Sequence, residues 1–138
     1  MHTTTTMTAT VVFDGGSRGN PGPAYGSFCL DLGDGLAEVQ RIEFAEPLTN
    51  NQAEYRTLIA ALEALLELLE RRGIRPDAVT VELQTDSELV VRQLRGAYKV
   101  RNPNLRDLHE RARRLLDHFG RWDIAWQPRA VIYRYFGH

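Results

Sequence analysis

Three acidic residues stand where the chain passes from one kind of sequence pattern to another. Asp14 closes a short β-rich run, Glu54 lies in the first turn of an amphipathic helical segment, and Asp86 closes a later β-rich run. If the two runs form neighbouring strands, their carboxyl ends lie side by side, and Glu54 can reach them from a covering helix. Carboxylates that converge with no matching Lys or Arg repel one another, and divalent cations relieve that repulsion. Oxygen-only ligands suit Mg²⁺ or Mn²⁺.

Each of these acids also has an ordinary structural interpretation. Asp14 can be a turn former, Glu54 can favour the positive end of the helix dipole, and Asp86 can cap the helix that follows it. Taken singly, these roles are the common ones for such positions. Taken together, three acids at the junctions of predicted elements favour a metal site.

Hydrophobic periodicity predicts the elements that position these acids. Two-residue alternation and turn residues predict three antiparallel strands, with a glycine-rich loop after the first and a hairpin turn at 33–35 before the third. Thr49 and Gln52 form a capping box, and leucines at helical spacing follow as far as Gly73. The predicted strands are 8–13, 25–32 and 36–44, and the loop is 15–23.

The second half of the chain alternates strands and helices. A fourth strand is predicted at 79–85 and a fifth at 122–126, with one helix from 86 to 96 and another capped by Asn102 and Pro103. The order, an antiparallel meander of strands 1–3 followed by β–α–β crossovers, predicts an α/β fold with a mixed sheet and helices on its faces. Residues 128–138 have no clear pattern.

The composition bounds the class of protein. The chain has 138 residues, 43% hydrophobic and 25% charged, which fits one domain at 8–138 after a flexible N-terminal tail at 1–7. The net charge of -1 does not mark a nucleic-acid binder, although arginines are frequent between Arg92 and Arg114. Cys29 is the only cysteine, which excludes an internal disulfide and a cysteine-based zinc site. No signal peptide or membrane-spanning stretch is evident, so we expect a cytoplasmic monomer.

Several segments together resemble a known family. Residues 13–22 (FDGGSRGNPG), 49–55 (TNNQAEY) and 85–87 (TDS) resemble, in order, three core motifs of type 1 ribonuclease H. Residues 98–105 (YKVRNPNL) look like the compact bacterial and archaeal branch, which lacks a long basic insertion. Residues 126–129 (WQPR) resemble the last strand and the start of a fourth motif, so the resemblance covers about 8–129. It implies a ribonuclease H-like fold, a five-stranded mixed sheet with strands 1–3 antiparallel, strands 1, 4 and 5 parallel, and helices on both faces.

The resemblance also implies an activity and a set of functional residues. The expected reaction is endonucleolytic hydrolysis of the RNA strand of an RNA–DNA hybrid, leaving 5′-phosphate and 3′-hydroxyl ends. Asp14, Glu54 and Asp86 would hold two Mg²⁺ ions, or Mn²⁺, with Asp14 bridging them. Positions that match the family's contacts to the hybrid are Gly15, Gly16, Asn20, Thr49, Asn50, Gln52 and Asn102. The glycines and Asn20 are equally well explained as turn residues, and Thr49 as a helix cap.

The C-terminal segment departs from the family pattern. The family carries a fourth acid in a final short helix, but this chain has no Asp or Glu after Asp123. At the family spacing from Arg129 the slot falls near Phe136, and with two inserted residues it falls on His138, which we therefore include as a candidate catalytic and metal-binding residue. The missing acid leaves an alternative function, a catalytically weak module that binds the hybrid through the same groove. A proofreading-type exonuclease would need an acid at Gly16.

Overall fold

The computed structural model describes residues 7–34 and 38–136, and its centre is a five-stranded sheet of order β3-β2-β1-β4-β5. Strands β1, β2 and β3 pair antiparallel, whereas β1 with β4 and β4 with β5 pair parallel. This is the predicted mixed sheet. The strands are β1 (Met7–Ser17), β2 (Ala24–Asp31), β3 (Glu38–Glu43), β4 (Val79–Thr85) and β5 (Arg121–Trp126).

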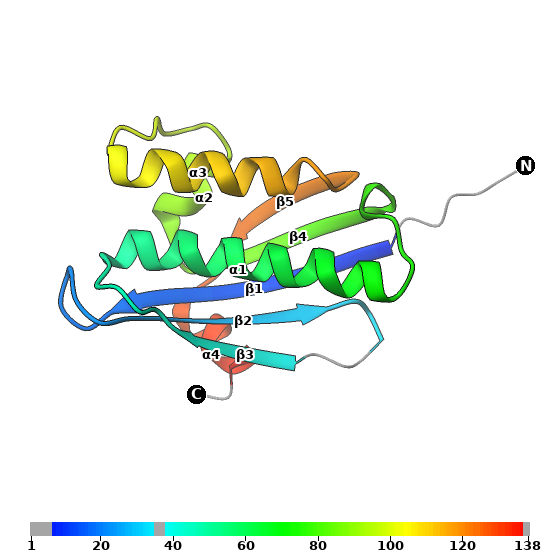
Figure 1. Cartoon of the computed structure of the whole chain (residues 1–138), viewed down its shortest axis with the longest axis horizontal. Helices are drawn as coiled ribbons and strands as arrows, with labels where there is room; N and C mark the ends of the chain where they lie inside the picture. Colours follow the sequence, from blue (N-terminus) through cyan, green and yellow to red (C-terminus); the bar gives the residue numbers. More distant parts are fainter. Residues whose placement is uncertain (1–6, 35–37, 137–138) are drawn as a thin grey trace, which may run out of the picture.

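Helices cover both faces of the sheet, as predicted. The helices are α1 (Asn50–Arg71), α2 (Glu88–Leu94), α3 (Pro103–Leu116) and α4 (Arg129–Tyr135), with a short 3-10 turn η1 (Pro76–Ala78) before β4. Helix α1 crosses the sheet with α3 beside it, and the small α4 lies under the opposite face (Figure 1). Among the described helices, none is long and apolar enough to cross a membrane.

Strand alternation places two of the buried apolar clusters, one large and one small, on opposite faces of the sheet. Val11 and Phe13 of β1 point toward α1 and belong to the main cluster, which also takes in the apolar faces of α2 and α3. Val12, between them, points the other way and packs with Cys29 and with Ile132 and Phe136 of α4. Helix α4 is therefore attached to the sheet through a separate, smaller apolar cluster.

The first strand is longer than the sequence pattern indicated. It begins at Met7 and continues through Ser17, so the first three residues of the predicted glycine-rich loop belong to the strand. Gly15 pairs with Gly26, and a Cβ built on Gly15 would lie 2.5 Å from the carbonyl oxygen of Ala53 in α1. The absence of a side chain therefore lets α1 cross directly over the end of the strand. The start of the predicted third strand, at 36 and 37, lies outside the described residues.

Candidate active site

Asp14 and Asp86 are brought together by the parallel pairing of β1 with β4, as the sequence predicted. The paired register runs as far as Val12 with Gln84, and Asp86 follows directly after β4. The Asp86 carbonyl accepts a hydrogen bond from the indole Nε1 of Trp126 at 3.1 Å. Because the N-cap of α2 is Ser87, whose hydroxyl accepts from the Val90 amide, the carboxylate of Asp86 is not used as a helix cap.

Glu54 reaches the same point from α1. The helix is capped by Thr49 and carries no acid in its first turn, so Glu54 stands in the second turn, one residue later than predicted. This position excludes the helix-dipole interpretation, which requires the first turn. The side chain is buried, with 7% of its surface exposed. A buried carboxylate with no structural role at the helix end requires another explanation.

Ligand atoms from Asp14, Glu54 and Asp86 all lie within 4.8 Å of one another. Burial, and then the charge of Asp86, raise the pKa of Asp14 to about 6, against the opposing effect of Arg129. Burial, and then the charges of Asp14 and Asp86, raise the pKa of Glu54 well above its ordinary value. The cluster therefore stores electrostatic repulsion that a bound cation would remove.

One atom of the cluster shows that the residues fit a divalent cation. Glu54 Oε2 is buried and has no hydrogen-bond partner. A buried oxygen without a partner costs free energy unless something else satisfies it. Three carboxylates supply the oxygen-only donor set of Mg²⁺ or Mn²⁺, and a cation bound there would satisfy Glu54 Oε2.

The expectation that no Lys or Arg faces the acids is wrong. Arg129 Nε donates to Asp86 Oδ2 at 3.2 Å, while the Arg129 side chain stays largely exposed. After β5, the Gln127 amide still bonds to the Thr85 carbonyl, and Pro128 then turns the chain into α4 beneath the site. The segment 126–129 contained this arginine, but only the chain reversal brings it to Asp86.

Two predicted substrate-binding residues, Asn20 and Asn50, are joined at the surface, and Asn50 lies about one helical turn before Glu54. The amide of Asn50 donates to Asn20 Oδ1 at 2.9 Å, and the side-chain oxygen of Asn50 accepts from the amide of Ser17, also at 2.9 Å. Gly16 lies against the Tyr25 ring, since a Cβ there would be 2.8 Å from the phenol oxygen. Asn20 therefore does more than form a turn: it fixes the loop after β1 to the start of α1.

The remaining predicted contacts are helix caps. Thr49 and Gln52 form the predicted capping box, with the Gln52 amide donating to Thr49 Oγ1 and the Thr49 amide to Gln52 Oε1. Asn102 caps α3 by accepting from the Asn104 amide at 2.9 Å. Helices α1 and α3 both begin at the end of the molecule where β1, β4 and β5 end (Figure 1).

The C-terminal segment forms α4, which the sequence analysis left unassigned. Phe136, at the family spacing for a fourth acid, is buried against the underside of the sheet. His138 lies outside the described residues. Tyr133, one helical turn after Arg129, shares a cleft with Asp14 and was missed by sequence reasoning. No spacing signal marked this tyrosine, because its position depends on how α4 docks.

Comparison with known proteins places this site in a family. A family model described as "Reverse transcriptase-like" matches residues 13–132. Ribonuclease HI of Halobacterium salinarum is 45% identical over 119 residues, which are 86% of this chain and 56% of that protein. The chain thus spans little more than half the length of this curated relative.

Solved structures match along almost their whole length. The crystal structure of RNase H1 from Halobacterium salinarum has a TM-score of 0.78 and 43% identity, covering 92% of this chain and 90% of that one. A second, LC11-RNase H1 in complex with an RNA/DNA hybrid, has a TM-score of 0.78 and 31% identity, covering 91% and 89%. The similarity therefore extends over about nine tenths of this chain.

Proposed function

The chain belongs to the type 1 ribonuclease H family, and we propose that it cuts the RNA strand of RNA–DNA hybrids internally, leaving 5′-phosphate and 3′-hydroxyl ends. The observation that carries the proposal is the cluster of Asp14, Glu54 and Asp86 with its unpartnered buried oxygen. The similar LC11 enzyme was crystallised with an RNA/DNA hybrid, which supports the same class of substrate here.

We assign Asp14, Glu54 and Asp86 as the residues that hold two Mg²⁺ ions, or Mn²⁺. Such ions would supply an activated water and neutralise charge on the leaving oxygen. The chain's own contribution is to hold three carboxylates on the ends of rigid elements before substrate arrives. Arg129, on Asp86, adds one positive charge at the edge of the cluster, where a phosphate of the substrate can compete for it.

The surface formed by Asn20 and Asn50 provides the basis for telling RNA from DNA. Their amide groups lie beside the acids and can donate to and accept from 2′-hydroxyls. The missing side chains of Gly15 and Gly16 leave space that the Ala53 backbone and the Tyr25 phenol fill, so these glycines would serve the site by setting the course of β1 beside Asp14. The Thr49 and Asn102 caps stand at helix N-termini, which favour the phosphates of the DNA strand.

A weaker, binding-only role is the second candidate, and α4 favours it. The helix presents Arg129 and Tyr133 near the acids, and Phe136 is buried, so α4 supplies no carboxylate within the described residues. A site with one ligand fewer binds cations less tightly. This candidate retains hybrid binding and loses most of the cleavage.

A single comparison of substrates tests both candidates. The chain is incubated with labelled RNA–DNA hybrid, single-stranded RNA and duplex DNA, each with Mg²⁺, with Mn²⁺ and with chelator. We expect metal-dependent cutting of the RNA in the hybrid and little cutting of the other two. Hybrid binding without cleavage would select the binding module, and equal cutting of duplex DNA would exclude both.

We also propose that the chain acts as a monomer in the cytoplasm. Cys29 is buried between the sheet and α4 and is unpaired, which suits a reducing compartment. All groups of the proposed site come from one copy of the chain. Sedimentation of the purified protein, alone and with hybrid, tests the monomer directly.

A further inference from the structure

A cleft of about 410 Å³ opens beside Asp14, between β2, β3 and α4. Strand alternation places its β2 and β3 side chains on the same face as Cys29, which is the face that α4 covers. Asp14 closes one end, so the cleft is continuous with the carboxylate cluster. We call it the Arg18 cleft, and the residues that matter here are Arg18, Tyr25, Ser27, Arg41, Glu43 and Tyr133.

Two guanidinium groups in this cleft are available for an anion. The Arg18 guanidinium carbon lies 5.9 Å from the centre of the Tyr25 ring, and Arg41 Nη2 donates to the Phe136 carbonyl at 2.9 Å. Neither arginine forms an ion pair with a carboxylate of residues 7–34 and 38–136. Guanidinium groups that no carboxylate neutralises are suited to bind a phosphate.

The other walls of the cleft suit a sugar and a base. Tyr25 and Tyr133 supply aromatic surface and phenol groups, and Ser27 supplies a hydroxyl. The carboxylate of Glu43 disfavours a second phosphate but accepts hydrogen bonds from a ribose hydroxyl or a base amino group. Together these groups match a ribonucleotide, which joins one phosphate to hydroxyls and a flat base.

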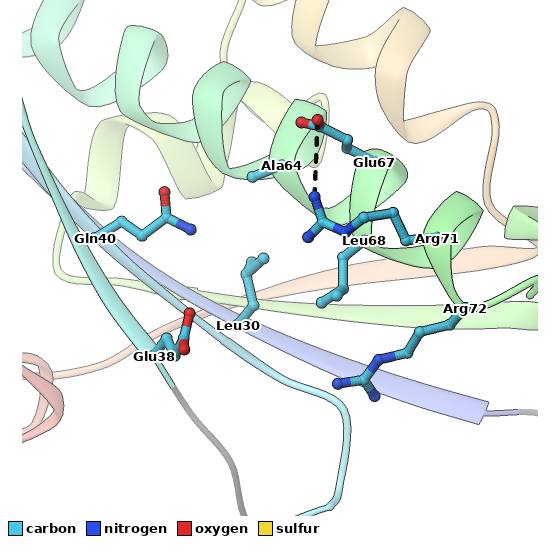
Figure 2. A pocket seen from close by; sticks show the side chains of 8 residues that line it. All are labelled: Leu30, Glu38, Gln40, Ala64, Glu67, Leu68, Arg71 and Arg72. Carbon is cyan, nitrogen blue, oxygen red and sulfur yellow. Dashed lines mark ion pairs between the residues drawn. The ribbon is translucent and has the colours of Figure 1, made fainter.

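A second groove also contains two arginines, but both of them form ion pairs with carboxylates. It has a volume of about 490 Å³ and lies between α1 and the β2–β3 part of the sheet, on the opposite face. Figure 2 shows the side chain of Arg71 pointing at Glu67, and the ion pair between them has a length of 3.8 Å. Arg72 is paired with Asp34 at 3.0 Å. Its cations are already neutralised, and none of the three catalytic acids lines it.

We propose that the Arg18 cleft binds the nucleotide of the RNA strand next to the cleavage point, with Arg18 and Arg41 on its phosphate. Tyr133 is a positioning residue in the same subsite, where its phenol donates to this nucleotide. The inference rests on the proposed function, because it takes the RNA strand as the ligand. It adds a subsite outside the carboxylate cluster and outside the surface of Asn20 and Asn50.

The test pairs Arg18→Gln with hybrids in which one RNA phosphate at a time is an uncharged methylphosphonate. We expect Arg18→Gln to lower kcat/KM on the normal hybrid by about tenfold, the effect of one lost phosphate contact. At one linkage beside the cleavage point, a neutral phosphate should lower the kcat/KM of the wild type by about the same factor. Combining that linkage with Arg18→Gln should lower kcat/KM no further, because both changes remove the same contact. Losses that multiply at every linkage would overturn the proposal.

Matched variants separate the cleft from general electrostatics and from folding. Arg134→Gln removes an exposed charge from α4 outside the cleft. Any decrease in kcat/KM that it causes should multiply with the decrease caused by each neutral linkage, because the two changes affect different contacts. Arg41 is not the test variant, because its bond to the Phe136 carbonyl also holds α4. If the wild type cleaves nothing, the proposed activity fails. The effects of Arg18→Gln and of the neutral linkages, alone and combined, are then compared through the dissociation constants of the hybrids. Hybrid binding too weak to measure would overturn both proposals.

The phenol of Tyr133 is tested by Tyr133→Phe, with Tyr135→Phe as the control. Tyr135 is 43% exposed and lies outside the cleft. We expect Tyr133→Phe to raise KM several-fold with little change in kcat, because a contact to a nucleotide away from the reacting atoms is made before and during reaction. An unchanged KM, or the same change in Tyr135→Phe, would remove Tyr133 from the subsite.

Discussion

Replacing Asp14 with asparagine should abolish activity while making the metal-free protein more stable. The amide keeps the shape of the side chain but removes one of three converging charges. Losing a metal-ligating carboxylate removes several kcal/mol of transition-state stabilisation, so we expect a loss of roughly a thousandfold or more in hydrolysis.

The gain in stability follows from the pKa of Asp14. In the folded protein, burial and Asp86 raise that pKa from 3.8 to about 6. A carboxyl group with a raised folded pKa costs nothing below its unfolded pKa, where both states are protonated. It destabilises the fold increasingly as pH rises through the interval from 3.8 to about 6. Each pKa unit corresponds to about 1.4 kcal/mol, so after allowing for partial solvent exposure the penalty at neutral pH is about 2 kcal/mol.

Thermal unfolding in chelator measures this penalty. At neutral pH, Asp14→Asn should unfold roughly 6 °C higher than the wild type, by the usual scaling for a domain of this size. Near pH 3.5 the two proteins should unfold together, because the wild-type carboxyl is then protonated in both states. Added Mg²⁺ should raise the melting temperature of the wild type more than that of the variant. A variant that is less stable at neutral pH, or one that keeps wild-type turnover, would refute the reasoning.

Four further outcomes follow from the same geometry. Mg²⁺ binding near pH 6 should release protons, fewer as pH rises, because the pKa values of Asp14 and Glu54 are raised; calorimetry in buffers of different ionisation enthalpy measures this, and release independent of pH would contradict it. Gly15→Ala should cost about 3 kcal/mol in denaturant unfolding because its Cβ meets the backbone of α1, whereas no loss would show that the helix can shift. Thr49→Ala should cost about 1 kcal/mol of stability through the lost cap. Hybrid affinity should fall roughly a hundredfold between about 50 and about 200 mM salt, for about four phosphate contacts, and an affinity independent of salt would count against phosphate binding.

Elements with strong periodicity could be predicted from the sequence, and so could the acids at their ends. The parallel pairing of β1 with β4, which agrees with the resemblance, brings Asp14 to Asp86. Helix α1 was marked by its capping box and its leucines. Local patterns were sufficient to locate each acid, because the strand or helix that carries it could be recognised from its own segment of the sequence.

Features that depend on the detailed packing of side chains between two elements could not be predicted in this way. The extension of β1 through Gly15 and Gly16 exists because β2 and α1 lie close enough to need residues without side chains. Helix α4 carries Val131, Ile132 and two tyrosines, whose intrinsic preference is for strands. Its packing against Val12 decides its conformation, and with it the position of Arg129.

The separate attachment of α4 means that the residues of α4 can vary while the three acids keep their positions. Asp14, Glu54 and Asp86 are carried by elements that share the main core. Helix α4 is held instead by Ile132 and Phe136 in the small cluster, each contributing about 2 kcal/mol of apolar burial, and by the bond from Arg41. A change in which groups α4 presents therefore alters the charge and hydrogen bonding beside Asp14 and leaves the geometry of the carboxylates intact. The same independence makes α4 the element through which substrate preference can vary without loss of the fold.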